Sequence, residues 1–227
     1  MKKNFKIKTA IVGGGFSGIS AAYTLAKAGH IVTIYEKDSN LGGLAGSFKT
    51  KKFTLEKFYH MWYATDIEIF NFIKKLGLSK KLKKIVSRVA IYSNQSIYNF
   101  SKPIDVIKFK PLPFLSRIKF LLFVIKCWYF TDKKKLETIN CEKWITKTAD
   151  QKIYDVIWKP LLIGKFGRYY KNVSAIWLWN KIVIRGKSRS FKNSSEQLFY
   201  YKGGFSSLVE DIKKILINKK TKIKLDE

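Results

Sequence analysis

The chain has 227 residues, of which 46% are hydrophobic and 15% aromatic, so it can bury a sizeable core as a globular protein. Its two cysteines and two histidines form no C-x-x-C pair or other metal-ligand cluster, which argues against a disulfide scaffold and a metal site. The formal charge of +29 introduces a further hypothesis, that the protein binds nucleic acid or an anionic membrane surface.

The basic residues do not form a pattern typical of nucleic-acid binding. Only five of the 45 are arginines, and the lysines are spread over nearly every segment of the chain. No stacking platform of aromatic residues or arginine-rich face accompanies them. We therefore expect no nucleic-acid partner, and we interpret most lysines as solvated surface positions.

The first glycine cluster follows a predicted strand and opens a predicted helix. Residues 7–12 (IKTAIV) are a short apolar run, and residues 16–28 have helical spacing. Gly13, Gly15 and Gly18 fill the pattern G-x-G-x-x-G at the turn between them. In that pattern the first glycine allows a tight turn, the second lets the backbone approach a pyrophosphate, and the third lets the helix pack on the strand. The pattern predicts a nucleotide site, with a purely structural strand-turn-helix as the alternative.

The next predicted strand ends in an acidic residue. Gly29 ends the helix, residues 30–35 (HIVTIY) have strand character, and Glu36 follows. At this distance a carboxylate accepts hydrogen bonds from the ribose hydroxyls of an adenine dinucleotide. It would also repel a 2′-phosphate, which disfavours NADP.

A second glycine cluster lies at residues 40–46 (NLGGLAG). From residue 10 to residue 60 the chain resembles the flavin amine oxidase superfamily, which includes protoporphyrinogen oxidases and phytoene desaturases. Gly42 and Gly43 match the Gly-Gly pair that follows the acidic residue in that family. The stretch at residues 42–48 (GGLAGSF), followed by residues 55–60 (LEKFYH), particularly resembles its bacterial protoporphyrinogen-oxidase-like members. One departure is Asn40, where the family often has a basic residue.

This resemblance implies FAD as the cofactor and transfer of a hydride from a substrate C–H bond to the flavin. His60 is a weak candidate for a catalytic contact, with a structural role as its alternative. Two other functions stay open, a UDP-galactopyranose-mutase-like flavoenzyme without net oxidation and a non-catalytic nucleotide-binding fragment. The residues that the resemblance assigns to cofactor binding are Gly13, Gly15, Phe16, Ser17, Gly18, Glu36, Lys37, Gly42, Gly43, Leu44 and Ala45.

After residue 60 the pattern becomes mostly helical. A helix is predicted from Thr65 or Asp66 to Gly77, a hairpin over residues 89–100 that turns near Asn94, and a helix over residues 118–129. We therefore expect an α/β fold, with a Rossmann-like FAD-binding domain and an inserted, mostly helical α+β substrate domain. The expected FAD-binding domain comprises residues 1–60 and 200–227 and is incomplete, and the expected insertion comprises residues 61–199.

The predicted helix at residues 118–129 is amphipathic and basic. Such a helix either packs in the substrate domain or lies on a membrane surface, and its uncharged core is far below the roughly 20 residues that span a bilayer. The first 15 residues lack the apolar stretch of a signal peptide. We expect a cytoplasmic protein that acts on a small molecule, with a lipophilic substrate and peripheral contact at the inner face of the membrane as the option that the resemblance raises.

The last third of the chain extends the resemblance. Residues 157–167 and 173–182 resemble the substrate domain of the family, and their tryptophans are interpreted as scaffold. Residues 200–207 (YYKGGFSS) resemble a Gly-Gly turn that leads back to the FAD-binding domain, and residues 221–225 start a strand. Family members continue with further strands and a C-terminal glycine-rich segment. We therefore expect an N-terminal fragment, or one part of a split protein whose C-terminal half is encoded separately.

Overall fold

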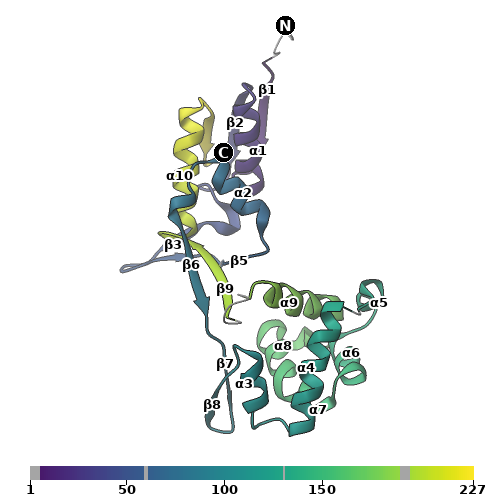
Figure 1. Ribbon diagram of the computed structural model, residues 1–227. Helices are drawn as coiled ribbons and strands as arrows, with labels where there is room; N and C mark the ends of the chain where they lie inside the picture. The colour runs from purple at the N-terminus through teal and green to yellow at the C-terminus, as the bar shows by residue number, and fades with distance from the viewer. Residues whose placement is uncertain (1–5, 59–60, 130, 190–194) are drawn as a thin grey trace. The chain divides into compact units, whose positions relative to one another are not determined.

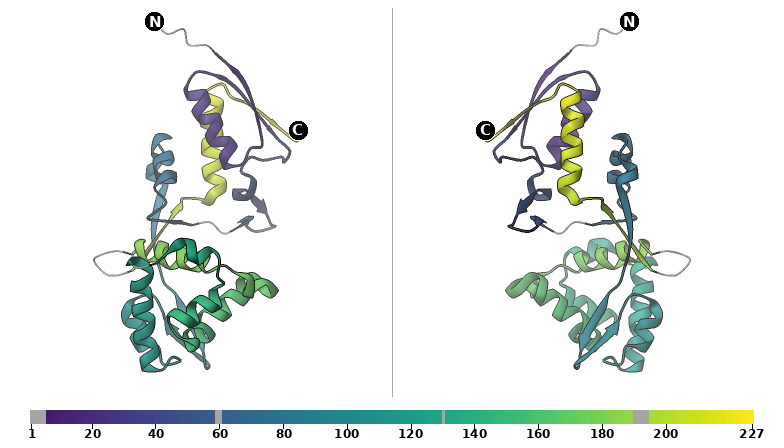
Figure 2. Two further views of the ribbon diagram at one scale, coloured as in Figure 1. Left: turned by 90° about the vertical axis from the view of Figure 1, so that its right-hand side faces the viewer. Right: turned by 90° about the vertical axis from the view of Figure 1, so that its left-hand side faces the viewer.

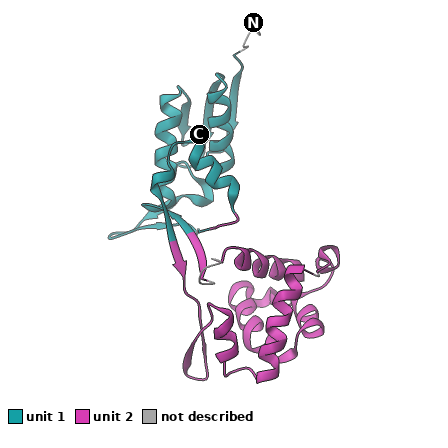
Figure 3. Ribbon diagram, viewed as in Figure 1, with its two compact units in different colours: residues 1–62, 66–84, 199–227 teal, residues 63–65, 85–198 magenta. Residues whose placement is uncertain are grey.

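The computed structural model of the chain describes residues 6–58, 61–129, 131–189 and 195–227, and the catalytic candidate His60 lies outside these ranges. The chain divides into two compact units (Figure 3). Unit 1 comprises residues 1–62, 66–84 and 199–227, and unit 2 comprises residues 63–65 and 85–198. The boundaries expected from the sequence differ mainly at residues 66–84, which are part of unit 1.

Unit 1 is built on a three-stranded parallel sheet with the strand order β1-β2-β10 (Figure 1). In the register of the sheet, Ile34 lies beside Ile11 on one side and beside Ile223 on the other. Each crossover carries a helix that starts at a glycine turn. The bounds are β1 (Lys8–Val12), α1 (Phe16–Lys27), β2 (Ile31–Glu36), α10 (Gly204–Asn218) and β10 (Lys222–Leu225).

Both helices pack on the same face of this sheet, side by side (Figure 2). Alternate residues of β2 point into that face, so Val32, Ile34 and Glu36 are buried while Ile31 is exposed. The apolar residues of α10 recur at helical spacing and complete the core. The buried side chains that the two helices contribute are Ile19, Ala22, Tyr23, Phe205, Leu208, Val209, Ile212 and Leu216.

The segment after β2 forms a loop and a hairpin, followed by a helix of unit 1. Asp66 occupies the N-cap position of this helix, as predicted, but its side chain makes no capping hydrogen bond. Gly77 follows the helix with a φ of 76°, the left-handed conformation that glycine adopts most easily. The bounds are η1 (Gly43–Ala45), β3 (Ser47–Lys49), β4 (Thr54–Glu56), α2 (Ile67–Lys75) and η2 (Ser79–Lys81).

The chain passes between the units in three strands that pair in the order β5-β9-β6. They are β5 (Trp62–Tyr63), β6 (Leu82–Ser87) and β9 (Glu196–Tyr201). The sequence pattern did not predict this sheet, because β5 and β6 are short or lysine-rich and lack a clear alternation of apolar and polar residues.

Unit 2 consists of a hairpin and a group of helices (Figure 1). The hairpin turns at Asn94 and Gln95, whose φ angles of 49° and 59° confirm the predicted turn near Asn94. The strands of the hairpin are β7 (Ala90–Ser93) and β8 (Ser96–Asn99). The helical segments of unit 2 are α3 (Pro103–Lys108), α4 (Phe114–Tyr129), α5 (Lys133–Glu137), α6 (Cys141–Thr148), α7 (Gln151–Ile153), the π-helical segment η3 (Tyr154–Trp158), α8 (Lys159–Phe166), η4 (Gly167–Asn172) and α9 (Ala175–Lys187).

Aromatic residues form much of the core of unit 2. Trp144 is buried with its ring centroid 5.0 Å from that of Phe123, and Trp158 stacks on Phe120 at 6.1 Å. Trp177 and Trp179 are partly buried against the same cluster. These residues have the scaffold role that the sequence indicated.

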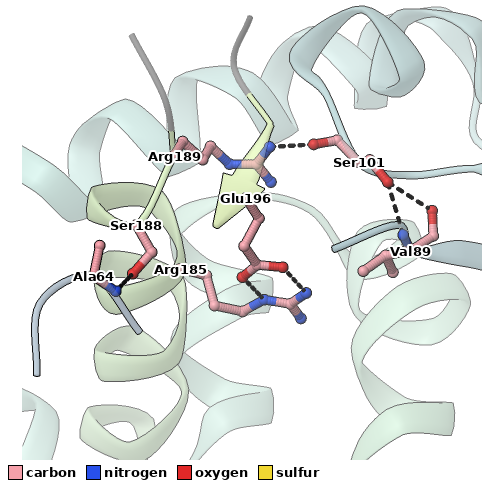
Figure 4. Close-up of polar contacts among 7 residues, drawn as sticks. All are labelled: Ala64, Val89, Ser101, Arg185, Ser188, Arg189 and Glu196. Carbon is pink, nitrogen blue, oxygen red and sulfur yellow. Dashed lines mark hydrogen bonds and ion pairs between the residues drawn. The ribbon is translucent and has the colours of Figure 1, made fainter. Parts of the chain in front are cut away.

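A polar network fastens the C-terminal end of α9 within unit 2 (Figure 4). The Arg185 guanidinium donates two hydrogen bonds to the buried Glu196 carboxylate, from Nε at 2.7 Å and from Nη2 at 2.8 Å. Arg189 donates to the Ser101 carbonyl oxygen, and the Ser101 hydroxyl accepts from Val89 N–H at 2.7 Å. Bidentate pairs of this kind are strong and directional, so the network fixes the start of β9 against α9.

The fold is therefore a mixed α/β fold. Among the residues that the structure describes, no helix is both long enough and apolar enough to cross a membrane.

Candidate functional site

A cleft of about 580 Å³ opens in unit 1 above the turn between β1 and α1. Backbone of both glycine clusters forms one part of its wall, and aliphatic and aromatic side chains form the rest. No acidic, basic or histidine side chain is among the lining residues in the described part of the chain. They are Val12, Gly13, Gly15, Phe16, Ser17, Gly18, Gly42, Leu44, Ala45, Trp62, Ile69 and Phe205.

Gly13, Gly15 and Gly18 of the first cluster each need to be glycine for a different geometric reason. Gly13 has a φ of 97°, which a residue with a side chain rarely adopts. A Cβ atom on Gly15 would meet no atom within 4 Å, so the space above this residue is open to a ligand. A Cβ atom on Gly18 would instead collide with the carbonyl oxygen of Gly13. The turn therefore closes on itself at Gly18 and leaves room at Gly15.

The N-terminus of α1 faces this open space without a side-chain cap. Gly15 is the N-cap residue, no side chain makes a capping hydrogen bond, and the first turn contains no acidic residue. The first N–H groups of a helix have no acceptors within the helix, and the helix dipole makes this end favourable for an anion. The site is therefore suited to a pyrophosphate.

The second glycine cluster packs backbone to backbone against the first. Gly42 N–H donates to the Gly14 carbonyl oxygen at 2.8 Å, and Gly42 forms a parallel bridge with Gly15. A Cβ atom on Gly43 would lie 3.2 Å from the Gly15 Cα atom, and Gly42 and Gly43 have φ angles of 120° and 55°. This contact explains why glycines occur in both segments.

Glu36 lies beneath the loop and does not line the cleft. Its Oε2 atom accepts a hydrogen bond from Gly14 N–H at 2.5 Å, and its Oε1 atom accepts one from Asp38 N–H at 2.9 Å. The side chain is buried. A carboxylate has about four lone-pair sites, so it could also accept from a ribose hydroxyl. In the structure, however, Glu36 already holds the first glycine loop in place.

The structure brings most of the predicted cofactor residues together in one cleft. Gly43, Glu36 and Lys37 are the predicted residues that do not line it. Gly43 supports the wall from behind through its packing on Gly15, and Lys37 is exposed. Those that line it are Gly13, Gly15, Phe16, Ser17, Gly18, Gly42, Leu44 and Ala45.

Of the aromatic residues that line the cleft, only Phe16 was predicted from the sequence, and Trp62 and Phe205 were not. The Phe205 ring is buried, with its centroid 4.7 Å from that of Trp62 and 5.8 Å from that of Phe16. Val12 and Ile69 add aliphatic surface. Phe205 directly follows the Gly203–Gly204 pair, and this position at a glycine turn before a helix is the one signal in the sequence that could have found it.

The lining determines what this cleft can do. Backbone N–H groups and a helix N-terminus can hold phosphates, and aromatic and aliphatic side chains can hold a flat ring system. Within the ranges that the structure describes, which leave out residues 59 and 60, the lining includes no side chain that transfers protons at neutral pH. A bound cofactor would supply the reactivity that these lining residues lack.

Comparison with known proteins agrees with this interpretation. A family model described as flavin containing amine oxidoreductase matches residues 16–227. Zeta-carotene desaturase from Capsicum annuum is 38% identical over 78 residues, a match that covers 34% of this chain and 13% of the desaturase.

Two solved structures share the fold. One is assigned as a protoporphyrinogen oxidase from Exiguobacterium sp. 255-15, with a TM-score of 0.64 and 19% identity over 98% of this chain and 53% of that one. The other is a putrescine oxidase bound to putrescine, with a TM-score of 0.67 and 16% identity over 98% of this chain and 51% of that one. The chain thus spans about half the length of each of these structures.

Proposed function

The chain belongs to the flavin containing amine oxidoreductase family, and on that premise we propose that its unit 1 cleft binds FAD as part of an FAD-dependent oxidoreductase. The observation that carries this proposal is the uncapped N-terminus of α1 beneath the open space at Gly15. It combines a helix dipole, free backbone donors and room for a pyrophosphate in one place. Unit 1 would then belong to a Rossmann-like FAD-binding domain.

In this proposal the residues of the chain bind and orient the cofactor. The N–H groups at the start of α1 hold the pyrophosphate, and Glu36 accepts a hydrogen bond from the adenosine ribose in addition to its two backbone partners. Leu44 and Ala45 lie on the side nearer the flavin ring. Phe16, Trp62 and Phe205 exclude water from the cleft. The bound flavin supplies the acceptor for a hydride from a substrate C–H bond.

For the substrate, we propose a small lipophilic molecule. Zeta-carotene desaturase supports this class by its name. Oxidation of a C–H bond fits a cleft whose described lining residues carry no proton-transfer side chain, because the flavin carries the reaction. The family match and the desaturase favour this function over a mutase without net oxidation.

The test is a titration of the purified protein with FAD under anaerobic conditions, followed by a candidate substrate. We expect saturable FAD binding and loss of the oxidised flavin absorbance when substrate is added. NADP serves as the control, and it should bind more weakly because Glu36 repels its 2′-phosphate. Absence of FAD binding would contradict the proposal, and a requirement for prior reduction would support the mutase instead.

We also propose that α4 lies on an anionic membrane surface. Its packing face consists of Ser116, Phe120, Phe123 and Cys127, so the apolar stripe that the sequence pattern emphasised faces outward. That exposed stripe is defined here as the α4 stripe. It consists of Phe114, Leu115, Ile118, Leu122, Ile125, Trp128 and Tyr129.

Charge around the α4 stripe favours a bilayer over a protein partner. Residues 106–135 contain eight basic residues and one acidic residue. Lys119 and Lys126 lie beside the stripe on the helix, and Lys133, Lys134 and Lys135 follow it. Basic residues next to an exposed apolar and aromatic face are typical of helices that lie in the membrane interface. Each lysine near an anionic surface adds about 1 kcal/mol to such binding.

A further inference from the structure

The second glycine turn of unit 1 opens α10 and leaves its N-terminus without a local cap. Gly203 and Gly204 both have left-handed φ angles, 86° and 78°. Gly203, the N-cap residue, has no side chain, and the first turn of α10 contains no acidic residue. The first N–H groups of a helix have no acceptors within the helix, so an acceptor from elsewhere in the fold can cap them.

Glu56 at the end of β4 supplies that acceptor. Its Oε1 atom accepts a hydrogen bond from Phe205 N–H at 2.8 Å. A Cβ atom on Gly204 would lie 2.9 Å from the same oxygen, and the φ of 78° at this residue favours glycine. The carboxylate also accepts a hydrogen bond from the Tyr200 hydroxyl. The pKa of Tyr200 is raised, mainly because the hydroxyl is buried and also because of this hydrogen bond. Glu56 therefore acts as a cap from a distant strand.

The same residue joins both walls of the cleft. On one side, β4 pairs with β3. Glu56 lies opposite Ser47, the residue that directly follows the second glycine cluster. The adjacent Lys57 N–H donates to the Gly46 carbonyl oxygen at 3.0 Å. On the other side Glu56 holds the backbone of Phe205, whose ring packs on Trp62.

From this geometry we propose that Glu56 is a positioning residue of the cleft. It sets the place of the Phe205 ring relative to the second glycine cluster, and it does so without lining the cleft itself. A negative charge at the N-terminus of α10 also interacts favourably with the helix dipole. The N-termini of α1 and α10 then have different tasks, since α1 leaves its N–H groups open to a ligand and α10 has one of them occupied by Glu56. The inference rests on the proposed function in one respect, namely that the ligand of the cleft is FAD.

The experiment compares Glu56→Ala and Glu56→Gln with Asp211→Asn. Asp211 is a matched control because it lies on α10, the helix that Glu56 caps. Its carboxylate accepts a hydrogen bond from the Tyr201 hydroxyl at 2.5 Å and pairs with Lys81, yet it does not line the cleft. Two properties are measured, FAD affinity and amide hydrogen exchange over residues 203–208 without nucleotide.

We expect Glu56→Ala to exchange faster at Phe205 and to bind FAD about tenfold more weakly, because the loss of one charge-assisted hydrogen bond changes an equilibrium by about this factor. Glu56→Gln retains an amide oxygen as acceptor, so its affinity should stay within about threefold of the wild type. Asp211→Asn should leave both properties near the wild-type values.

Wild-type FAD affinity in Glu56→Ala together with faster exchange at Phe205 would overturn the proposal, because Glu56 would then cap the helix without affecting the cleft. If Glu56→Ala does not fold, Glu56→Asp replaces it, since the shorter side chain keeps the charge but cannot reach Phe205 N–H equally well. Unchanged exchange and affinity in Glu56→Asp would also overturn it. Should the wild type fail to bind FAD, the proposed function fails, and faster exchange at Phe205 in Glu56→Ala but not in Asp211→Asn then shows the cap of α10 by Glu56 without the positioning role.

Discussion

The backbone N–H of Gly42 donates a hydrogen bond to the carbonyl oxygen of Gly14 at 2.8 Å, which joins the two glycine clusters of the chain in one surface. The backbones can approach this closely because neither segment carries side chains at the contact. A side chain added at one of these glycines therefore has an effect that depends on what its Cβ atom meets.

Gly15→Ala and Gly18→Ala should separate ligand binding from folding. At Gly15 the backbone conformation suits alanine and the added methyl group meets no protein atom, so we expect wild-type stability but at least about tenfold weaker FAD binding. At Gly18 the methyl group meets the Gly13 carbonyl oxygen, so we expect a loss of about 1 to 3 kcal/mol in the free energy of unfolding. Urea unfolding and FAD titration measure the two effects. Tight FAD binding by Gly15→Ala would place the pyrophosphate elsewhere.

Glu36→Gln should weaken FAD binding and also destabilise unit 1. The sequence alone indicated only the first effect, but the carboxylate accepts from two backbone N–H groups, and one of them would face an NH₂ group in the variant. A buried donor left without an acceptor costs about 1 to 3 kcal/mol. Glu210→Gln, at an exposed position of α10, is the control. Equal FAD affinities in wild type and Glu36→Gln, after correction for the folded fraction, would remove the ribose role of Glu36.

The Arg185–Glu196 pair should make the stability of unit 2 sensitive to acid. Burial alone would raise the pKa of the Glu196 carboxyl, but the hydrogen bonds and charge of Arg185 outweigh it, and the pKa is lowered from its ordinary value of 4.5. The stabilisation is therefore fully present above the ordinary pKa and is lost as the pH falls towards the lowered one.

Glu196→Gln, which leaves Arg185 without its ion pair, should cost about 1.5 kcal/mol at neutral pH, because the Arg185 side chain is 39% exposed and water solvates part of its charge. The difference in unfolding free energy between wild type and Glu196→Gln should shrink as the pH falls below about 4.5. Urea unfolding at several pH values measures it. A difference that does not change with pH would show that Glu196 titrates normally.

Both cysteines should resist thiol reagents while the protein is folded. Cys127 and Cys141 are buried, and burial raises the pKa of each thiol to about 12. Since the thiolate is the reactive form, we expect negligible reaction with a thiol reagent at pH 8 and complete reaction in denaturant. Rapid labelling of the native protein would mean that unit 2 opens locally around α4 and α6.

The α4 stripe should bind vesicles that contain anionic lipid. Replacement of Leu115 and Leu122 by serine removes apolar surface that is about 60% exposed at both positions, and we expect at least about tenfold weaker vesicle binding. Ile97→Ser is the control, because Ile97 is also exposed but lies on the hairpin of unit 2. Binding should weaken with salt and in neutral vesicles. If the double variant instead abolishes self-association and leaves vesicle binding intact, the stripe is a contact between copies of the chain.

The sequence alone determined the order of strand, glycine turn, helix, strand and acid in residues 7–36. Each of these features is local, since hydrophobic periodicity and glycine placement depend on neighbours within a few residues. The hairpin at Asn94 and the helix after Gly203 were predictable for the same reason. The resemblance to flavin amine oxidases also depended on short motifs, and the family match to residues 16–227 agrees with it.

Only the tertiary structure decided which distant residues meet. The hydrogen bond from Phe205 N–H to Glu56, the packing of Trp62 on Phe205 and the pair of Arg185 with Glu196 join residues whose separation in the sequence carries no periodic signal. The orientation of α4 was also decided there, because an amphipathic pattern defines an apolar stripe but not which side of a helix the neighbouring helices cover. That choice depends on the whole packed unit, where burial of Phe120, Phe123 and Cys127 against the other helices leaves the α4 stripe exposed.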